Sequence, residues 1–271
     1  KDGNTITVKR MLEDGYMTIK VKTPCLLTCI KELNNPRYMS VSGVFEAYSK
    51  PMSVFDYEAL KDDPLIDATA ALLVNADTGM VLYEKNADEK RYPASTTKIM
   101  TALLAIERLD PETVVTVPKE AVGIEGSSIY LTEGEQITVS DLLYGLMLES
   151  GNDAATALAI AAGGTVEDFV RLMNERAAEL GLEDTHFSNP HGLSADDHYT
   201  TYDLARLTCA ALENETFAAI VSCKTKTISD GRRYLSNHNR LLRSYEGCIG
   251  VKTGYTLATG RTLVTAAERD G

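Results

Sequence analysis

The stretch Arg91-Tyr92-Pro93-Ala94-Ser95-Thr96-Thr97-Lys98 opens a segment of the chain whose apolar residues recur at helical spacing. Proline is tolerated at the start of a helix, and the pair Asp110-Pro111 would stop one. The apolar positions between them are Ile99, Met100, Leu103, Leu104 and Ile106. The pattern therefore predicts a helix with Ser95 in its first turn, and residues three apart share a helix face, so Lys98 is expected to lie beside Ser95.

Two more short motifs follow this one in the chain, Ser150-Gly151-Asn152 and Lys252-Thr253-Gly254. The order S-x-x-K, S-x-N and K-T-G is that of serine acyl-transferases which act on penicillin-like or D-Ala-D-Ala substrates. Each motif alone is compatible with an ordinary helix start, turn or solvated strand lysine. Because all three occur in order, the combination favours the chemical interpretation.

The first motif supplies a candidate nucleophile and its base. A serine hydroxyl is a poor nucleophile near neutral pH and needs a base within hydrogen-bond reach, a role that Lys98 would fill for Ser95. A lysine acts as a base only if burial or a nearby like charge lowers its pKa, and Lys252 is the candidate for that charge. Free N–H groups at the helix start would stabilise negative charge near Ser95 and form half of an oxyanion hole.

The other two motifs supply candidate substrate contacts. We expect Ser150 to pass a proton between Lys98 and a leaving amine, and the Asn152 amide to bind a substrate peptide group. Lys252 and Thr253 offer a charge and a hydroxyl to a terminal carboxylate. Gly254 would let a substrate lie close against its strand, and the N–H of Tyr255 would complete the oxyanion hole.

The histidines and cysteines give no metal or cofactor motif, so neither group is expected. Of the four histidines, His238 is the one placed to face the cleft, shortly before the K-T-G strand, whereas His186, His191 and His198 are expected to be ordinary loop residues. The five cysteines form no C-x-x-C pair, and we expect them to be structural free thiols.

Composition indicates a folded, acidic protein with a change of character near Asp62-Asp63-Pro64. The net charge of −12 argues against a nucleic-acid partner, because phosphate binding requires clustered Lys and Arg. Residues 1–66 carry equal numbers of basic and acidic side chains, so the whole net charge falls on 67–271. Neither an apolar run of membrane-spanning length nor a leader at Lys1 is present, so we expect no membrane segment or signal peptide in this chain.

Alternating and helical patterns predict an α+β fold, with an antiparallel sheet flanked by helices and an added helical lobe. Predicted helices begin at capping boxes, and the S-x-N motif falls in a tight connection between two of them. The predicted strands are Thr5–Arg10, Tyr16–Lys22, Ala70–Asn75, Met80–Glu84, Val221–Ile228, Arg232–Leu235, Cys248–Thr256 and Thr262–Glu268. Capping boxes are at Thr138 and Asp141, Thr165 and Asp168, and Thr200 and Asp203; a short helix is also predicted over Cys25–Leu33.

From about Asp67 to its end, the chain resembles the D-alanyl-D-alanine carboxypeptidases, the low-molecular-weight penicillin-binding proteins among serine peptidases. The resemblance lies in the three motifs and their surroundings. These are Ala71-Leu-Leu-Val-Asn-Ala-Asp-Thr-Gly79, Arg91 to Lys98, Glu149-Ser-Gly-Asn-Asp-Ala154, Phe187-Ser-Asn-Pro-His-Gly-Leu193 and Gly250-Val-Lys-Thr-Gly-Tyr-Thr256.

The resemblance implies that Ser95 attacks the terminal D-Ala-D-Ala bond of a peptidoglycan stem peptide, that D-Ala leaves, and that water releases the acyl-enzyme. β-Lactams would acylate the same serine as covalent inhibitors. By position Lys98 would be the base, Ser150 the proton relay, Asn152, Lys252 and Thr253 the substrate-binding residues, and Ser95 and Tyr255 the oxyanion amides. The resemblance also implies an extracytoplasmic, cell-envelope location and a fold like that of serine β-lactamases.

Two departures from the family pattern concern the ends of the chain. Family members continue past a strand such as Thr262–Glu268 into a further sheet strand and a final helix, so a chain ending at Gly271 is expected to be truncated before both. Residues from about 5 to 63 instead resemble the C-terminal part of an electron-transfer flavoprotein β subunit. The matching segments are Val8-Lys-Arg-Met-Leu-Glu-Asp-Gly15, Thr23-Pro-Cys-Leu-Leu-Thr28 and Lys31-Glu-Leu-Asn-Asn-Pro-Arg-Tyr38.

We therefore expect a chimera with a head over 1–66 and a peptidase-like catalytic domain over 67–271, without flavin or nucleotide binding. One alternative function is a serine β-lactamase on the same scaffold. Gly151 disfavours it, because penicillin-hydrolysing relatives commonly carry S-D-N and a glutamate-bearing loop. The other alternative is an inactive, incompletely folded fusion whose head docks a redox partner.

Overall fold

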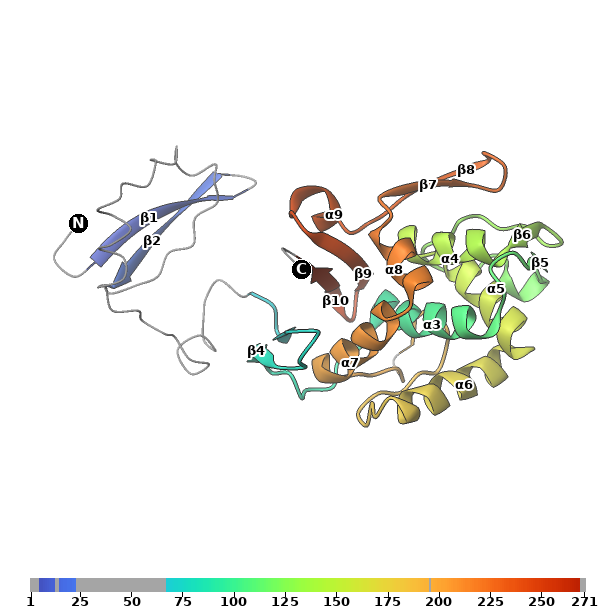
Figure 1. Ribbon diagram of the computed structural model, residues 1–271, viewed down its shortest axis with the longest axis horizontal. Helices are drawn as coiled ribbons and strands as arrows, with labels where there is room; N and C mark the ends of the chain where they lie inside the picture. The colour runs from blue at the N-terminus through green and yellow to red at the C-terminus, as the bar shows by residue number, and fades with distance from the viewer. Residues whose placement is uncertain (1–4, 13–14, 23–66, 195, 269–271) are drawn as a thin grey trace. The chain divides into compact units, whose positions relative to one another are not determined.

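The computed structural model describes residues 5–12, 15–22, 67–194 and 196–268 of the chain. The chain divides into two units, Lys1–Leu65 and Ile66–Gly271. In the first unit, β1 (Thr5–Leu12) and β2 (Gly15–Lys22) form an antiparallel hairpin whose register runs from Thr5 opposite Lys22 to Leu12 opposite Gly15 (Figure 1). The two predicted strands are confirmed. The helix predicted over Cys25–Leu33 lies outside the described residues.

The second unit begins with a hairpin and the helix that carries the first motif. Strands β3 (Ala71–Val74) and β4 (Val81–Lys85) pair antiparallel, as the alternation predicted. A short 3-10 turn, η2 (Ala94–Thr97), leads directly into α3 (Lys98–Arg108). Ser95 therefore lies in η2 and Lys98 begins α3, so the two motif residues occupy successive turns of one continuous helical segment.

The helices that follow begin where the capping residues predicted. Thr138, Thr165 and Thr200 each accept a hydrogen bond from the backbone N–H three residues later, at 3.1, 3.0 and 3.2 Å. These caps precede α4 (Val139–Leu148), α6 (Val166–Glu179) and α7 (Thr201–Leu212). Between α4 and α6 lies α5 (Asn152–Gly163), so Ser150 and Gly151 form the tight connection expected for the S-x-N motif.

One of the helices that were not predicted, α8 (Glu215–Ser222), shortens a predicted strand. Asn214 caps α8 by accepting from the N–H groups of Thr216 and Phe217. The strand predicted over Val221–Ile228 is therefore wrong in its first four residues. Val221 is fully buried as part of α8, and β7 begins at Thr225.

The remaining elements are short strands and turns. Strand β7 (Thr225–Ile228) pairs with β8 (Arg233–Ser236), and β5 (Val114–Thr116) pairs with β6 (Gln136–Thr138). The turn η3 (Lys119–Ala121) lies between the two members of the β5–β6 pair. The chain then forms α9 (Leu241–Ser244), β9 (Cys248–Thr256) and β10 (Gly260–Ala267), which includes the predicted C-terminal strand pair.

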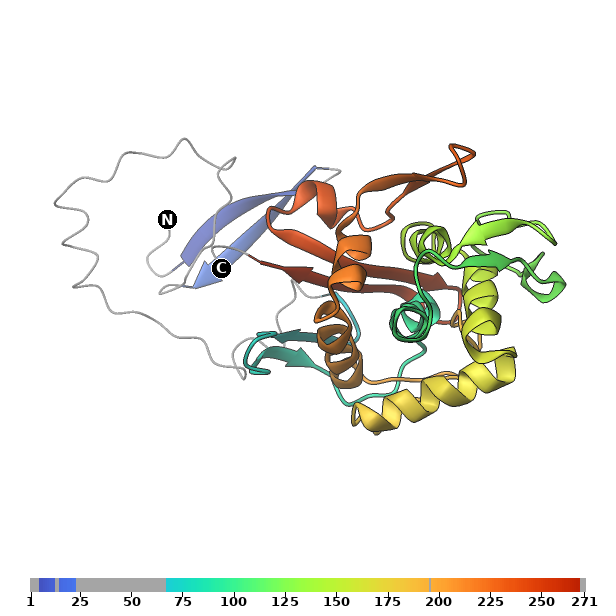
Figure 2. The ribbon, with the colours of Figure 1, turned by 45° about the vertical axis from the view of Figure 1, so that its right-hand side comes forward.

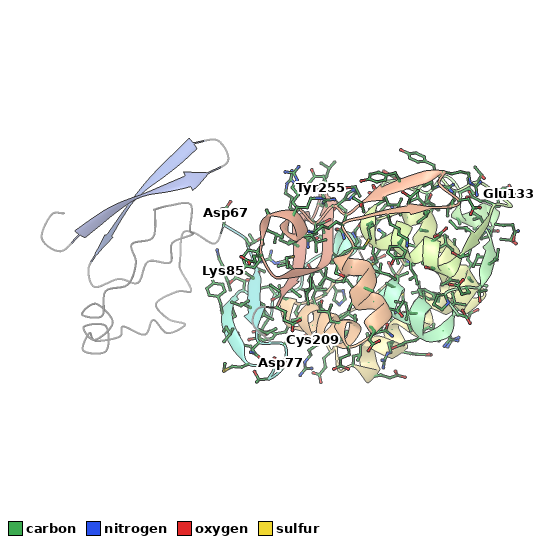
Figure 3. The ribbon with its side chains drawn as sticks, turned by 45° about the horizontal axis from the view of Figure 1, so that its top comes forward. Asp67, Asp77, Lys85, Glu133, Cys209 and Tyr255 are labelled. Carbon is green, nitrogen blue, oxygen red and sulfur yellow. The ribbon has the colours of Figure 1, made fainter. Side chains whose placement is uncertain are left out.

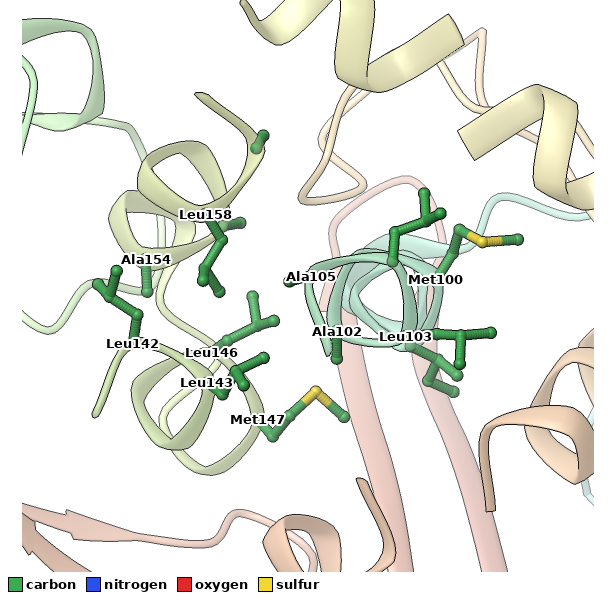
Figure 4. Close-up of a cluster of buried hydrophobic side chains, with 14 of the residues drawn as sticks. Met100, Ala102, Leu103, Ala105, Leu142, Leu143, Leu146, Met147, Ala154 and Leu158 are labelled. Atoms are coloured by element: carbon green, nitrogen blue, oxygen red, sulfur yellow. The ribbon is translucent and has the colours of Figure 1, made fainter. Parts of the chain in front are cut away.

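The core of this unit is built around α3. Its small residues Ala102 and Ala105 are fully buried and let α4 and α5 pack closely against it. Figure 4 shows Leu142, Leu143, Leu146 and Met147 of α4, with Ala154 and Leu158 of α5, gathered on that side of α3. Burying a large aliphatic side chain contributes about 1.5–3 kcal/mol, so this cluster fixes the helix that begins with Lys98.

The fold class is confirmed, because helices pack against antiparallel strands and form a separate lobe. The described strands pair two by two, and β9 packs against α8, α9 and η2 (Figure 2). Glu133, in the loop before β6, lies at one end of the unit, and Asp77 and Lys85 of the β3–β4 hairpin lie at the other (Figure 3). None of the helices in the described part of the chain is long and apolar enough to cross a membrane.

Candidate active site

The structure brings the three sequence motifs together around two buried lysines. Lys98 Nζ lies 3.0 Å from Ser95 Oγ and donates to Asn152 Oδ1 at 2.7 Å. Lys252 Nζ donates to Ser150 Oγ at 3.1 Å. The S-x-x-K segment comes from η2 and α3, the S-x-N segment from the α4–α5 connection, and the K-T-G segment from β9.

Lys98 is held so that its neutral form would act as a base toward Ser95. Its amine contacts two atoms that can only accept hydrogen bonds, Asn152 Oδ1 and the carbonyl oxygen of His191, the latter at 3.0 Å. A neutral amine has two N–H groups and one lone pair. Because the two acceptors use both N–H groups, the lone pair faces the third neighbour, Ser95 Oγ, which can donate its proton.

Burial and charge both favour that neutral form. Lys98 has no exposed surface, and desolvation lowers its pKa well below the usual value. The positive charge of Lys252 lowers the pKa further, while the carboxylate of Asp153 opposes both effects. When Lys252 is protonated, its charge thus acts on Lys98 in the expected direction, but burial is the larger cause.

Lys252 is also buried, with 1% of its surface exposed. Desolvation lowers its pKa to about 7, so a large fraction of the molecules would carry it uncharged near neutral pH. Its amine donates to the carbonyl oxygen of Thr253 at 2.9 Å as well as to Ser150. Of the two lysines, Lys252 is therefore the one that contacts the hydroxyl of Ser150.

The α4–α5 connection holds Ser150 and Asn152 in a strained turn that several hydrogen bonds fix. Ser150 has a positive φ of 61°, which is costly for a residue with a side chain and persists only where the surroundings fix it. The Asn152 N–H donates to the Ser127 carbonyl at 2.7 Å, and its Nδ2 donates to the Glu125 carbonyl at 2.5 Å. Both ends of the Asn152 amide are thus engaged within the protein.

Gly254 lies against the backbone at Ser95. A Cβ at Gly254 would fall 3.0 Å from the Ser95 nitrogen and 2.3 Å from Thr262 Oγ1, so a side chain there would push into the turn that carries Ser95. Thr253 pairs with Leu263 of β10, and Tyr255 pairs with Arg261 and exposes 60% of its surface. The end of β9 therefore borders Ser95, which is the arrangement that an oxyanion site between the two backbones requires.

Two supporting groups were not predicted, because their roles depend on contacts between distant segments. Asp153 is buried and accepts hydrogen bonds from Ser128 Oγ and from the N–H groups of Ile129 and Leu131, at 2.6–3.1 Å. It fixes the loop that carries Ser127 to the start of α5. The second group is the His191 carbonyl; burial and nearby Lys98 lower the pKa of the His191 ring to about 4.

His238, the histidine expected to face the cleft, contacts the residue before the S-x-N motif. Its Nε2 lies 3.1 Å from Glu149 Oε2, and 48% of its side chain is exposed. The Glu149 carboxylate also accepts from the Ser236 N–H at 2.7 Å. His238 therefore lies beside the α4–α5 connection: its N–H donates to the Leu148 carbonyl at 3.3 Å, and its ring contacts Glu149 and not Ser95 or either lysine. Across the described residues, no group of three or more His, Cys, Asp or Glu side chains is placed to hold a metal.

Comparison with known proteins gives consistent matches. A family profile described as D-alanyl-D-alanine carboxypeptidase matches residues 58–271. The chain is 41% identical over 214 residues to the D-alanyl-D-alanine carboxypeptidase DacF of Bacillus subtilis, a match covering 76% of this chain and 55% of that protein. It is 40% identical over 229 residues to the D-alanyl-D-alanine carboxypeptidase of Streptomyces sp. strain K15, covering 77% of this chain and 79% of that protein.

Solved structures agree with the sequence matches. A mutant of the Streptomyces K15 DD-transpeptidase matches with a TM-score of 0.72 and 38% identity, covering 77% of this chain and 88% of that one. A D-alanyl-D-alanine carboxypeptidase from Mycobacterium tuberculosis H37Rv matches with a TM-score of 0.72 and 35% identity, covering 75% and 79%. The likeness therefore extends over the whole region that contains the three motifs.

Proposed function

The chain belongs to the D-alanyl-D-alanine carboxypeptidase family of serine peptidases, and on that premise we propose that it removes the terminal D-Ala from peptidoglycan stem peptides through an acyl-enzyme on Ser95. The observation that carries the proposal is the arrangement at Ser95. Its hydroxyl lies 3.0 Å from a fully buried lysine whose two acceptor contacts direct the amine lone pair toward it.

The first half of the reaction forms the acyl-enzyme. Neutral Lys98 takes the proton of Ser95 as Oγ bonds to the carbonyl carbon of the penultimate D-Ala. The backbone N–H groups of Ser95 and Tyr255 would hold the resulting oxyanion, and the peptide C–N bond then breaks. Lys252 and Thr253 would bind the terminal carboxylate, which places the scissile bond over the nucleophile.

The leaving D-Ala nitrogen needs a proton as the C–N bond breaks. We assign its delivery to Ser150, whose hydroxyl lies 3.1 Å from Lys252 Nζ. A pKa of about 7 suits Lys252 to give up and regain a proton near neutral pH. Before the second half, Lys98 loses the proton that it took from Ser95 and Lys252 regains the one that it gave through Ser150, a net transfer through solvent that restores both amines. Water then attacks the ester carbon as Lys98 accepts its proton, and that proton returns to Ser95 Oγ as the ester C–O bond breaks and the shortened peptide leaves.

Three related functions are separated by their substrates. A synthetic peptide ending in D-Ala-D-Ala should release free D-Ala, measured with D-amino acid oxidase, whereas the same peptide ending in L-Ala should not. Rapid, repeated turnover of nitrocefin would instead favour a β-lactamase, and transfer to an added amine in preference to water would favour a transpeptidase. Absence of D-Ala release by the folded protein, with Ser95→Ala as the blank, would overturn the carboxypeptidase assignment.

β-Lactams are proposed as covalent inhibitors at the same serine, because their strained amide carbonyl would occupy the position of the scissile peptide. We also propose an extracytoplasmic site of action at the cell envelope, where peptidoglycan stem peptides are located. Both follow from the proposed substrate.

A further inference from the structure

The orientation of the Lys98 amine depends on a loop that contains none of the three motifs. The carbonyl of His191 takes one of the two N–H groups of neutral Lys98, and so leaves the lone pair for Ser95. If this carbonyl moved away, the freed N–H could turn toward Ser95 Oγ and the lone pair away from it. The position of the His191 peptide unit is therefore part of the base's geometry.

Asn189 holds this turn from within. Its Oδ1 accepts from the N–H groups of His191 and Gly192 at 3.0 and 2.6 Å. The turn is also pressed against the nucleophile's own segment, because a Cβ at Gly192 would fall 1.9 Å from the Ala94 carbonyl oxygen. On its other side, Thr101 Oγ1 of α3 donates to the Pro190 carbonyl at 2.6 Å.

Asn189 is in turn fixed by Asp197, which is fully buried. Asp197 Oδ2 accepts from Asn189 Nδ2 at 3.0 Å, and Oδ1 accepts from the N–H and the hydroxyl of Ser188 at 2.6 and 2.7 Å. Because all three of these neighbours donate, the site requires an acceptor-only group, which an ionised carboxylate is. A buried carboxylate with such partners is costly to alter, because its removal leaves buried donors unsatisfied.

We propose that Asp197 is a positioning residue for the acylation step: through Asn189 it holds the His191 carbonyl that directs the Lys98 lone pair at Ser95. The inference rests on the proposed function, since it assigns Asp197 a part in the serine chemistry. Asp197 touches neither Ser95 nor Lys98 in the recorded contacts and acts through the loop between them.

The charged groups around Lys98 and Asp197 determine how the rate of acylation would depend on pH. Lys98 faces Lys252 of β9 and Asp153 of α5, and its charge also acts on the His191 ring. On the other side of the loop, burial raises the pKa of Asp197, while the hydrogen bonds from Ser188 and Asn189 oppose that shift. Replacing Asp197 leaves Lys252 and Asp153 in place, so a change in the behaviour of Lys98 would report the loss of the His191 contact.

The test is the rate constant for acylation by a fluorescent penicillin, measured against pH for the wild type and Asp197→Asn. In either orientation the NH2 of the introduced amide would face a donor, Asn189 Nδ2 or the Ser188 N–H, which displaces this segment and the turn that Asn189 holds. We expect the acylation rate constant to fall on the order of 10-fold, since small misplacement of a catalytic group has effects of this kind. The acid limb of the profile should also move to lower pH, because protonated Lys98 loses an acceptor.

Two controls separate positioning from simple damage to the fold. Asp196→Asn changes the neighbouring exposed carboxylate and should leave both rate and profile unchanged. Asp203→Asn removes a largely buried carboxylate that holds a different loop, through the Asp184 N–H and the Thr185 hydroxyl at 2.9 and 2.8 Å. It should lower stability and the labelled fraction without changing the rate constant or the acid limb of the molecules that react.

The inference is overturned if Asp197→Asn acylates with the wild-type rate constant and acid limb, or if Asp203→Asn changes both to the same extent. Should Asp197→Asn fail to fold, Ser188→Ala removes only one of the three bonds to Asp197. It should shift the profile in the same direction by less, and an unchanged profile would count equally against the inference. If the wild type itself is not labelled, the proposed function fails, which is a different result from labelling that is insensitive to Asp197.

Discussion

Replacing Lys252 with methionine should remove a specific pH dependence from the stability of the fold. Burial lowers the pKa of Lys252 from 10.5 to about 7, so between these values the unfolded chain binds a proton that the folded chain does not. The folded protein therefore loses no stability through Lys252 above pH 10.5, where the lysine is neutral in both states. As the pH falls toward 7, protonation of the unfolded chain lowers the free energy of unfolding. The interval is about 3.5 pH units, which at 1.36 kcal/mol per unit amounts to about 5 kcal/mol.

The quantity to be measured is how the unfolding free energy changes with pH. Its absolute difference between the wild type and Lys252→Met is less informative, because several competing contributions set it. Methionine keeps much of the volume but leaves Ser150 Oγ and the Thr253 carbonyl without their lysine donor, at a cost of about 1–3 kcal/mol each. That cost changes little with pH, whereas the linked proton contributes up to about 1.4 kcal/mol per pH unit.

The assay is urea unfolding of the wild type and Lys252→Met at pH 7.5, 8.5 and 9.5, with the exposed Lys119→Met as a matched control. The difference in unfolding free energy between the wild type and Lys252→Met should increase toward high pH in favour of the wild type. The control should run parallel to the wild type. If the unfolding free energy of Lys252→Met changed with pH in parallel with that of the wild type, burial would not lower the pKa of Lys252 to about 7, and the reasoning would be refuted.

Three further changes test other parts of the site. Asp153→Ala should destabilise the fold by about 3–5 kcal/mol in thermal or chemical unfolding, because it leaves the buried N–H groups of Ile129 and Leu131 without an acceptor. A loss below about 1 kcal/mol would contradict this. Gly254→Ala should slow acylation by about 100-fold with a smaller effect on unfolding, since its Cβ would press on the Ser95 nitrogen; unchanged labelling kinetics would speak against close contact there. Acylation by a penicillin should fall as the pH drops below the lowered pKa of Lys98, because only the neutral amine accepts the Ser95 proton, and a rate flat into mild acid would exclude Lys98 as the base.

The sequence predicts this fold well where the signal is local. The helix from Lys98 follows from apolar spacing, and the caps at Thr138, Thr165 and Thr200 follow from side chains that bond three residues along the chain. Helix α8 was missed because its β-branched Val221 also suits a strand, and the predicted strand begins at that residue. Burial against the core and the Asn214 cap decide for the helix.

Within the site, the motif residues could be named from sequence, but the connections between them could not. That Lys98 lies beside Ser95 follows from helical geometry, whereas the pairing of Lys252 with Ser150 joins residues 102 positions apart. The same holds for the His191 carbonyl, which is 93 positions from Lys98 and is a backbone atom that no motif encodes. Asp153 lies in the segment Glu149–Ala154 that resembles the family, yet its hydrogen bonds to Ser128 and Leu131 appear only in the folded chain.

The central claim, that Ser95 is an acylated nucleophile served by Lys98, is tested most directly by mass spectrometry of the folded protein after incubation with a penicillin. The account predicts one adduct with the mass of the intact β-lactam, located on the peptide that contains Ser95 and absent from Ser95→Ala. Absence of an adduct on the folded wild type, or an adduct that persists in Ser95→Ala, would contradict it.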